Sequence, residues 1–168
     1  MQTPYRKYDK IPHQKPDPHI TEEKFQELKN KLAKLKNIKR PREAEEVKRL
    51  AAMGDFSENA GYQLAKSRLR GINQGILDIE DLLSRAEIIK PIQNTGQVQL
   101  GNYVTIENMA SSKSKTYQIL GSAETNPLSG VISHNSPLGS ALLGKEVSEI
   151  ISLEVNGKII KYKIIKIE

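Results

Sequence analysis

Residues 60–90, AGYQLAKSRLRGINQGILDIEDLLSRAEIIK, decide the fold of this chain. Apolar side chains recur in this stretch at alternating intervals of three and four residues, at Tyr62, Ala65, Leu69, Ile72, Ile76, Ile79, Leu83 and Ala86. This spacing is typical of a helix with a single apolar seam, as in a coiled coil. At about 1.5 Å per residue, some 30 residues would form a helix roughly 45 Å long.

A second apolar seam precedes this helix. It runs through Phe25, Leu28, Leu32 and Leu35, breaks at residues 39–41, and resumes at Ala44, Val47 and Ala51. Thr21 suits the N-cap of this helix. Pro41 lacks a backbone donor, so it should kink or interrupt the helix. Because only residues 54–57 separate the two helices, we expect them to fold back as an antiparallel hairpin, a coiled-coil arm spanning residues 20–92.

The apolar pattern changes to a period of two after Pro91. Strands are expected at residues 103–106, 116–119, 131–133, 150–155 and 159–167. Asn156-Gly157 is a strong hairpin signal between the last two. Ser136 and Pro137 should open a short helix that ends at Gly144. The predicted fold class is therefore α+β: an N-terminal antiparallel helical hairpin, then a small, mostly antiparallel sheet domain with one short helix over residues 93–168.

Composition limits the classes of function. Residues 1–19 hold four of the eight prolines and almost no aliphatic side chains, so we expect a flexible basic tail. The net charge is +6, and residues 20–52, with ten Lys or Arg and six Glu, contribute +4. The excess positive charge of residues 20–52 favours a polyanionic partner such as nucleic acid. The alternative is that these Lys-rich helices are simply solvated and bind no such partner.

Other residue types narrow the possibilities further. The chain has no Cys, which excludes disulfides and thiolate metal sites. No apolar stretch approaches the roughly 20 residues that span a bilayer, and the N-terminus lacks the apolar region of a signal peptide, so we expect a cytoplasmic protein with no membrane partner. The three histidines, His13, His19 and His134, have no helical ligand spacing, and the sequence therefore predicts no zinc site.

The connection between the two helices, residues 54–59, carries two carboxylates, Asp55 and Glu58. Asp followed three residues later by Glu is close to a helix capping box, and spacing alone favours that interpretation. Alternatively, the carboxylates face outward and help to hold Mg²⁺, which prefers oxygen ligands and keeps several waters where a protein offers only one or two carboxylates. Such a pair becomes useful if a second protein supplies the remaining ligands.

The residues around these carboxylates resemble a known family. The segment GDFSENA (residues 54–60), followed by Tyr62, is similar to the tip motif of the GreA/GreB family of bacterial transcript-cleavage factors. Arg40-Pro41 is similar to that family's first helix. The segments IS (132–133), SPLG (136–139) and ALLGK (141–145) resemble its C-terminal signature. The resemblance covers about residues 20–168, so only the tail is additional.

The resemblance implies a transcription elongation factor whose arm enters the secondary channel of bacterial RNA polymerase. Asp55 and Glu58 would stabilise the second catalytic Mg²⁺, shared with the polymerase, and orient the attacking water. The polymerase would then hydrolyse the 3′ segment of backtracked nascent RNA. The protein would thus be a cofactor protein rather than an enzyme, and we expect a monomer.

The second domain resembles the FKBP-like fold with which this family docks on the polymerase. Its docking motif would include Ser133, Ser136, Pro137, Gly144 and Lys145. An FKBP-like fold can also carry prolyl isomerase activity, which needs an aromatic-lined pocket. Because the domain's only aromatic residues are three tyrosines, we interpret it as a docking module.

Other residues in and near the segment 54–59 are candidates for positioning water, packing or contacting RNA. Ser57 could position the attacking water or cap the helix, and the cap is favoured. Phe56 and Tyr62 are expected to pack the tip. Basic residues on the two helices could contact RNA phosphates or form a solvated face; they are Lys48, Arg49, Lys66 and Arg70.

Gly61 departs from the family pattern, because many members carry Glu there. This departure puts a third acidic contribution in doubt and favours one alternative, a non-cleaving regulator of the secondary channel. Retention of both Asp55 and Glu58 argues against that alternative. A third possibility is a coiled-coil adaptor or isomerase that does not bind polymerase.

Overall fold

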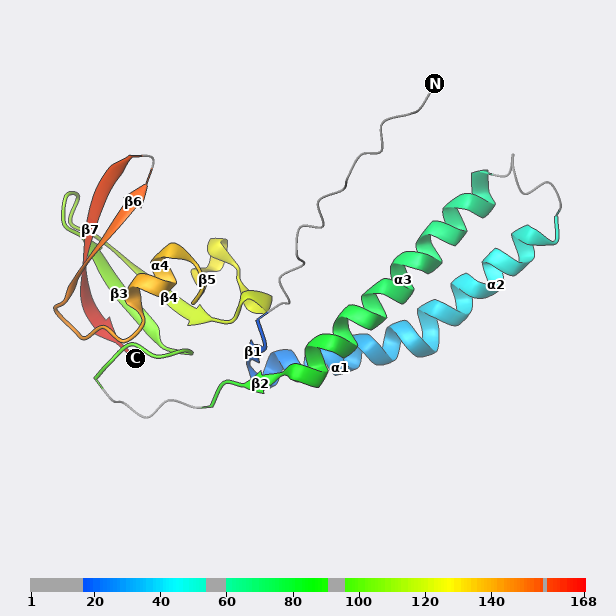
Figure 1. Ribbon diagram of the computed structural model, residues 1–168, viewed down its shortest axis with the longest axis horizontal. Helices are drawn as coiled ribbons and strands as arrows, with labels where there is room; N and C mark the ends of the chain where they lie inside the picture. Colours follow the sequence, from blue (N-terminus) through cyan, green and yellow to red (C-terminus); the bar gives the residue numbers. More distant parts are fainter. Residues whose placement is uncertain (1–16, 54–59, 91–95, 156) are drawn as a thin grey trace, which may run out of the picture.

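The fold consists of a long helical arm and a small sheet domain (Figure 1). It is given by a computed structural model, which describes residues 17–53, 60–90, 96–155 and 157–168. None of the helices in these ranges is long and apolar enough to cross a membrane. The predicted α+β class, with a helical hairpin followed by a mostly antiparallel sheet, is confirmed.

The first half of the arm comprises α1 (Glu22–Lys34), a π-helical turn η1 (Leu35–Lys39) and α2 (Arg40–Ala51). Thr21 is the N-cap, as predicted, and its Oγ1 accepts a hydrogen bond from the Lys24 amide at 3.2 Å. Pro41 lies in the first turn of α2. The predicted interruption takes the form of the wider π turn just before it, closed by the Arg40 amide donating to the Leu35 carbonyl. This turn accommodates a proline that supplies no amide donor.

The second half of the arm is α3 (Ala60–Arg85), which runs antiparallel to α1 and α2 (Figure 1). Its predicted seam faces the other helices: Ala65, Ile76 and Ile79 are buried. In the first seam, Ala44 is exposed, so its predicted place there is wrong. The π turn changes the rotation of α2 about its axis, so Glu43 is half-buried in place of Ala44, whereas Val47 and Ala51 are half-buried as the seam predicts.

The sheet domain contains five strands in the order β5-β4-β3-β7-β6. They are β3 (Tyr103–Asn108), β4 (Lys113–Leu120), β5 (Val131–Ser133), β6 (Ile150–Val155) and β7 (Lys158–Ile167). Within this sheet, β4 and β5 pair in parallel and the other neighbours pair antiparallel. All five lie where strands were predicted, and Val155 pairs with Lys158, as a two-residue hairpin connection requires.

Helical elements complete this domain: α4 (Pro137–Leu142) and the 3₁₀ turns η2 (Ser122–Glu124) and η3 (Pro127–Ser129). The α4 residue Leu142 is fully buried with Val104, Ile106, Ile119 and Ile164 of the sheet, which forms the domain core. Burial of each such aliphatic side chain contributes about 1.5–3 kcal/mol.

The arm meets the sheet domain at a small junction that the sequence analysis did not predict. There, β1 (His19–Ile20) pairs in parallel with β2 (Glu87–Ile88) at the base of the arm. Ile20 is fully buried in the arm's core cluster, and Ala123 of η2 packs against the same cluster. The two parts of the molecule therefore share apolar contacts.

Candidate functional site

The predicted catalytic segment lies outside the described residues. This applies to Asp55, Phe56, Ser57 and Glu58, so their roles stay predictions. The elements that flank them are described: α2 ends at Ala51 and α3 begins at Ala60, both at the end of the arm distant from the sheet domain (Figure 1). The described residues that flank the segment in the sequence, Ala51 and Ala60, therefore lie at the far end of the arm.

Near that end, α3 presents the predicted residues Tyr62, Lys66 and Arg70. The Lys66 Nζ lies 5.8 Å from the centroid of the Tyr62 ring, within the range of a cation–π contact. Tyr62 is half-buried, whereas Lys66 and Arg70 are exposed one turn apart. Their positions leave both charged groups accessible to a polyanion.

The α2 pair, Lys48 and Arg49, differs in electrostatic environment. Arg49 donates two hydrogen bonds to the Glu46 carboxylate, from Nε at 2.8 Å and from Nη2 at 2.7 Å. These bonds hold the pKa of Glu46 below its usual value. Lys48 forms no ion pair with any described residue. Of the two, Lys48 is therefore the better candidate for a phosphate contact.

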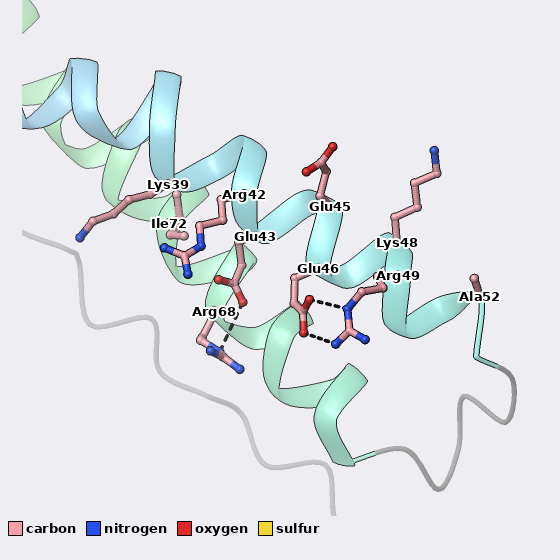
Figure 2. A pocket seen from close by; sticks show the side chains of 10 residues that line it. All are labelled: Lys39, Arg42, Glu43, Glu45, Glu46, Lys48, Arg49, Ala52, Arg68 and Ile72. Carbon is pink, nitrogen blue, oxygen red and sulfur yellow. Dashed lines mark hydrogen bonds and ion pairs between the residues drawn. The ribbon is translucent and has the colours of Figure 1, made fainter.

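Between the two helices of the arm lies an open groove of about 920 Å³ (Figure 2). Charged side chains of both signs line most of it: Lys39, Arg42, Glu43, Glu45, Glu46, Lys48, Arg49 and Arg68. Across the groove, Nε of Arg68 lies 3.4 Å from Oε1 of Glu43 and forms an ion pair with it. This buried Glu43 oxygen accepts no hydrogen bond from any described residue. Cations outnumber carboxylates in this lining, which suits an anionic partner.

The predicted docking residues stabilise the local structure of the sheet domain around α4. Ser136 caps α4, accepting from the Gly139 amide at 3.1 Å while its hydroxyl donates to the Ser133 carbonyl at 2.6 Å. Pro137 is the first residue of α4. Gly144, with φ +73°, ends the helix region as expected of a left-handed glycine. These roles fix the motif's local shape, and docking itself stays a prediction.

Lys145 belongs to the same motif and ties it to neighbouring chain segments. Its backbone carbonyl accepts from the Val98 amide at 2.8 Å, and its Nζ pairs with Glu149 at 3.0 Å. Together with an amide hydrogen bond from Glu146, this pairing lowers the pKa of the Glu149 carboxyl.

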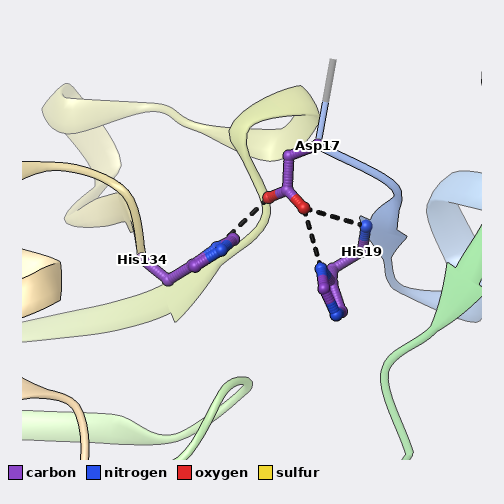
Figure 3. A group of neighbouring side chains, drawn as sticks. All are labelled: Asp17, His19 and His134. Atoms are coloured by element: carbon purple, nitrogen blue, oxygen red, sulfur yellow. Dashed lines mark hydrogen bonds and ion pairs between the residues drawn. The ribbon is translucent and has the colours of Figure 1, made fainter. Parts of the chain in front are cut away.

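The junction contains a cluster that the sequence analysis missed, formed by Asp17, His19 and His134 (Figure 3). Asp17 lies between the two rings: Oδ1 is 2.8 Å from His19 Nδ1, and Oδ2 is 3.1 Å from His134 Nδ1. The Ser122 amide also donates to Oδ2, at 3.1 Å. Burial opposes ionisation of Asp17, but the hydrogen bonds from His19 and Ser122 outweigh it and lower its pKa.

Sequence periodicity carries no signal for this cluster. His19 and His134 are far apart in the chain, and Asp17 falls in the segment interpreted as a tail. Only residues 17–19 of that segment are described, and they lie against the sheet domain. The tail prediction for residues 1–16 lies outside the described residues.

Further polar contacts bind the two sides of the junction. The Glu124 carboxylate accepts from the Thr21 amide at 2.8 Å and from the Thr21 hydroxyl at 2.6 Å. At Gly121, an added Cβ would lie 1.8 Å from the His19 carbonyl oxygen, so the two backbones approach closely only because residue 121 has no side chain.

Two family models match this architecture, one for each part. The model for the N-terminal domain of transcription elongation factors matches residues 19–88, and the GreA/GreB C-terminal model matches residues 93–168. These two matches cover the arm and the sheet domain respectively. The chain belongs to the GreA/GreB family of transcription elongation factors.

Two GreA proteins agree with this assignment. Transcription elongation factor GreA of Staphylococcus saprophyticus is 38% identical over 150 residues, covering 89% of this chain and 95% of the relative. GreA of Macrococcus caseolyticus is 37% identical, with 88% and 94% covered. Among solved structures, the GreA factor homolog 1 (Gfh1) protein of Thermus thermophilus is 27% identical, covers 90% of this chain and 99% of its own, and has a TM-score of 0.42.

Proposed function

We propose that this protein binds bacterial RNA polymerase, inserts its arm into the secondary channel, and stimulates Mg²⁺-dependent cleavage of backtracked nascent RNA. The observation that carries the proposal is the carboxylate pair Asp55 and Glu58, which lies in the sequence between α2 and α3. These two helices end and begin at the far end of the arm. Relatives named transcription elongation factor GreA support the polymerase as partner.

The donor chemistry of this pair suits Mg²⁺. Both residues offer carboxylate oxygens, the ligands that this ion prefers, and two carboxylates leave most of its coordination to water or to a second protein. When bound between the two proteins, the ion would stabilise charge on the reacting oxygens. Asp55 and Glu58 would hold it and orient the attacking water, so the chain contributes part of an active site without being an enzyme alone.

The arm's basic groups would then contact the extruded RNA. Lys66 and Arg70 on α3 are exposed, as is Lys48 on α2, and each could neutralise a backbone phosphate. Such contacts position RNA without reading its sequence. The sheet domain would bind the polymerase surface and so fix the position of the arm in the secondary channel.

The decisive experiment separates catalysis from helix capping. Asn caps helices about as well as Asp, so Asp55→Asn should preserve helix content and polymerase binding. Loss of the charge that Mg²⁺ needs should reduce RNA cleavage in a stalled, backtracked complex by at least about 100-fold. Glu58→Gln should behave alike, and the double variant should be little worse because both residues serve one ion.

Near-wild-type cleavage by Asp55→Asn, with polymerase binding retained, would overturn the catalytic assignment. It would instead support the second candidate, a regulator that occupies the channel without promoting cleavage. Gly61 is the observation that favours this candidate, because it stands where an acidic residue is common in the family.

A further inference from the structure

We propose that Asp17, His19 and His134 form a binding site for a divalent transition-metal ion of the Zn²⁺ type at the junction between arm and sheet domain. One ligand atom from each residue lies within 4.8 Å of the others. This proposal is independent of the proposed function, since none of the three residues lies near the far end of the arm.

The distances are close to those of a metal site. Zn²⁺ binds imidazole nitrogens and carboxylate oxygens at about 2.0–2.2 Å, which places neighbouring ligand atoms of a tetrahedron roughly 3.3 Å apart. Asp17 lies 2.8 Å from the Nδ1 of His19 and 3.1 Å from that of His134. These two distances reach different carboxylate oxygens, Oδ1 and Oδ2, so the ligand atoms must draw closer together to enclose one ion. Figure 3 shows the Nδ1 atoms of both rings directed towards Asp17.

The donor set selects the class of ion. Two imidazoles and one carboxylate suit Zn²⁺ and its neighbours, whereas Mg²⁺ and Ca²⁺ prefer all-oxygen ligands. Three protein ligands leave a fourth position for water. The His19 side chain is 38% exposed, so the cluster borders solvent.

His19 has a carboxylate near each of its two ring nitrogens. Nδ1 lies 2.8 Å from Asp17, and Nε2 lies 3.3 Å from Oε2 of Glu87. With a metal on Nδ1, the remaining Nε2–H would donate to Glu87, an arrangement that commonly orients metal-binding histidines.

The other two ligands are held in place by the surrounding backbone. The Asp17 side chain is only 6% exposed and accepts hydrogen bonds from the amides of His19 and Ser122. The His134 amide donates to the Leu120 carbonyl at 2.9 Å, which anchors its backbone next to β4. A site whose ligands are already positioned loses little entropy when it binds an ion.

Occupation of this site would have a structural consequence. Asp17 and His19 precede α1, whereas His134 follows β5 in the sheet domain. A bound ion would therefore link the base of the arm to the sheet domain and stabilise the junction in proportion to its concentration and affinity.

Titration calorimetry of the full chain with Zn²⁺ tests the proposal. The expected result is one ion per chain with micromolar or tighter affinity. Asp17→Asn and His134→Ala should each weaken binding by at least about 100-fold, and Glu87→Gln by roughly 10-fold, within the range for a residue that orients a ligand. His13→Ala is the matched control, since the proposed ligand set does not include His13, and it should leave the affinity unchanged.

Absorption of the Co²⁺-substituted protein provides a second measurement, because tetrahedral coordination gives intense visible bands. Melting curves without metal show whether each variant folds, and Glu87→Gln alters an exposed side chain that need not affect folding. Absence of Zn²⁺ binding by the wild-type chain overturns the proposal. So does unchanged affinity in the Asp17 and His134 variants, or an equal loss in His13→Ala.

Discussion

At the scale of single residues, Gly61 is the position where a substitution tests the arm most directly. It is the second residue of α3 and is exposed. Gly61→Glu adds a carboxylate in the first helical turn, where the helix dipole favours negative charge. If an acidic group there assists Mg²⁺ at the far end of the arm, cleavage should rise by about fivefold, equivalent to roughly 1 kcal/mol.

Gly61→Ala is the control for this experiment, because both variants improve helix propensity and only the Glu variant adds charge. Equal cleavage rates for the two variants in the backtracked-complex assay would exclude an electrostatic contribution from this position.

The affinity of Asp55 and Glu58 for Mg²⁺ is also a residue-scale property. Two carboxylates leave most of the coordination shell to water, so the isolated protein should bind Mg²⁺ only weakly, in the millimolar range. Calorimetry with Mg²⁺ checks this expectation. A micromolar site in the free chain would contradict the idea that the ion is shared with the polymerase.

At the scale of elements, α3 contains a glycine whose replacement should stabilise the arm. Gly71 is exposed in the helix interior, and an added Cβ would meet nothing within 4 Å. Gly71→Ala should therefore raise the free energy of unfolding by up to about 1 kcal/mol through lower unfolded-state entropy and better helix propensity. Urea denaturation monitored by circular dichroism measures this change.

Gly139 in α4 provides the contrasting control. An added Cβ there would lie 2.1 Å from the Ser133 carbonyl oxygen, which is backbone and cannot move aside alone. Gly139→Ala should destabilise the sheet domain, by about 1–3 kcal/mol as for other overpacked sites. A stabilising effect at Gly139, or a destabilising one at Gly71, would contradict the packing described above.

The π turn illustrates what local sequence can predict about an element. Pro41 identifies where the regular helix must fail, since its missing donor is a property of the residue itself. How the chain responds depends on the neighbouring helix: Lys36 in the π turn pairs with Glu80 of α3. The resulting rotation of α2 exposes Ala44 and half-buries Glu43, which apolar periodicity alone does not anticipate.

At the scale of the whole molecule, Gly121 controls how closely the arm and the sheet domain approach. An added Cβ would lie 1.8 Å from the His19 carbonyl oxygen, so Gly121→Ala must displace one backbone from the other. We expect a loss of about 1–3 kcal/mol in stability. Faster hydrogen exchange should appear at the Glu87 and Ile89 amides, which donate to Pro18 and Ile20 of the displaced segment.

Hydrogen exchange measured by mass spectrometry reports this effect, with Gly71→Ala as the matched control because it adds the same methyl group away from the junction. Unchanged exchange of the Glu87 and Ile89 amides in Gly121→Ala would show that the junction does not depend on this close approach.

The sequence by itself determined the long helices of the arm, α4 and the five strands of the sheet domain, because seams, caps and turns depend on residues only a few positions apart. The spacing of Tyr62 to Ala86 defines α3, and the turn signal at Asn156-Gly157 is sufficient to join β6 to β7. Family membership follows from equally local motifs. The tertiary structure alone decided the junction. There, Asp17 and His19 lie close to His134, and the missing side chain of Gly121 leaves room for the His19 backbone. Such contacts join residues more than a hundred positions apart, and they form only when the folded helices and sheet bring their ends together.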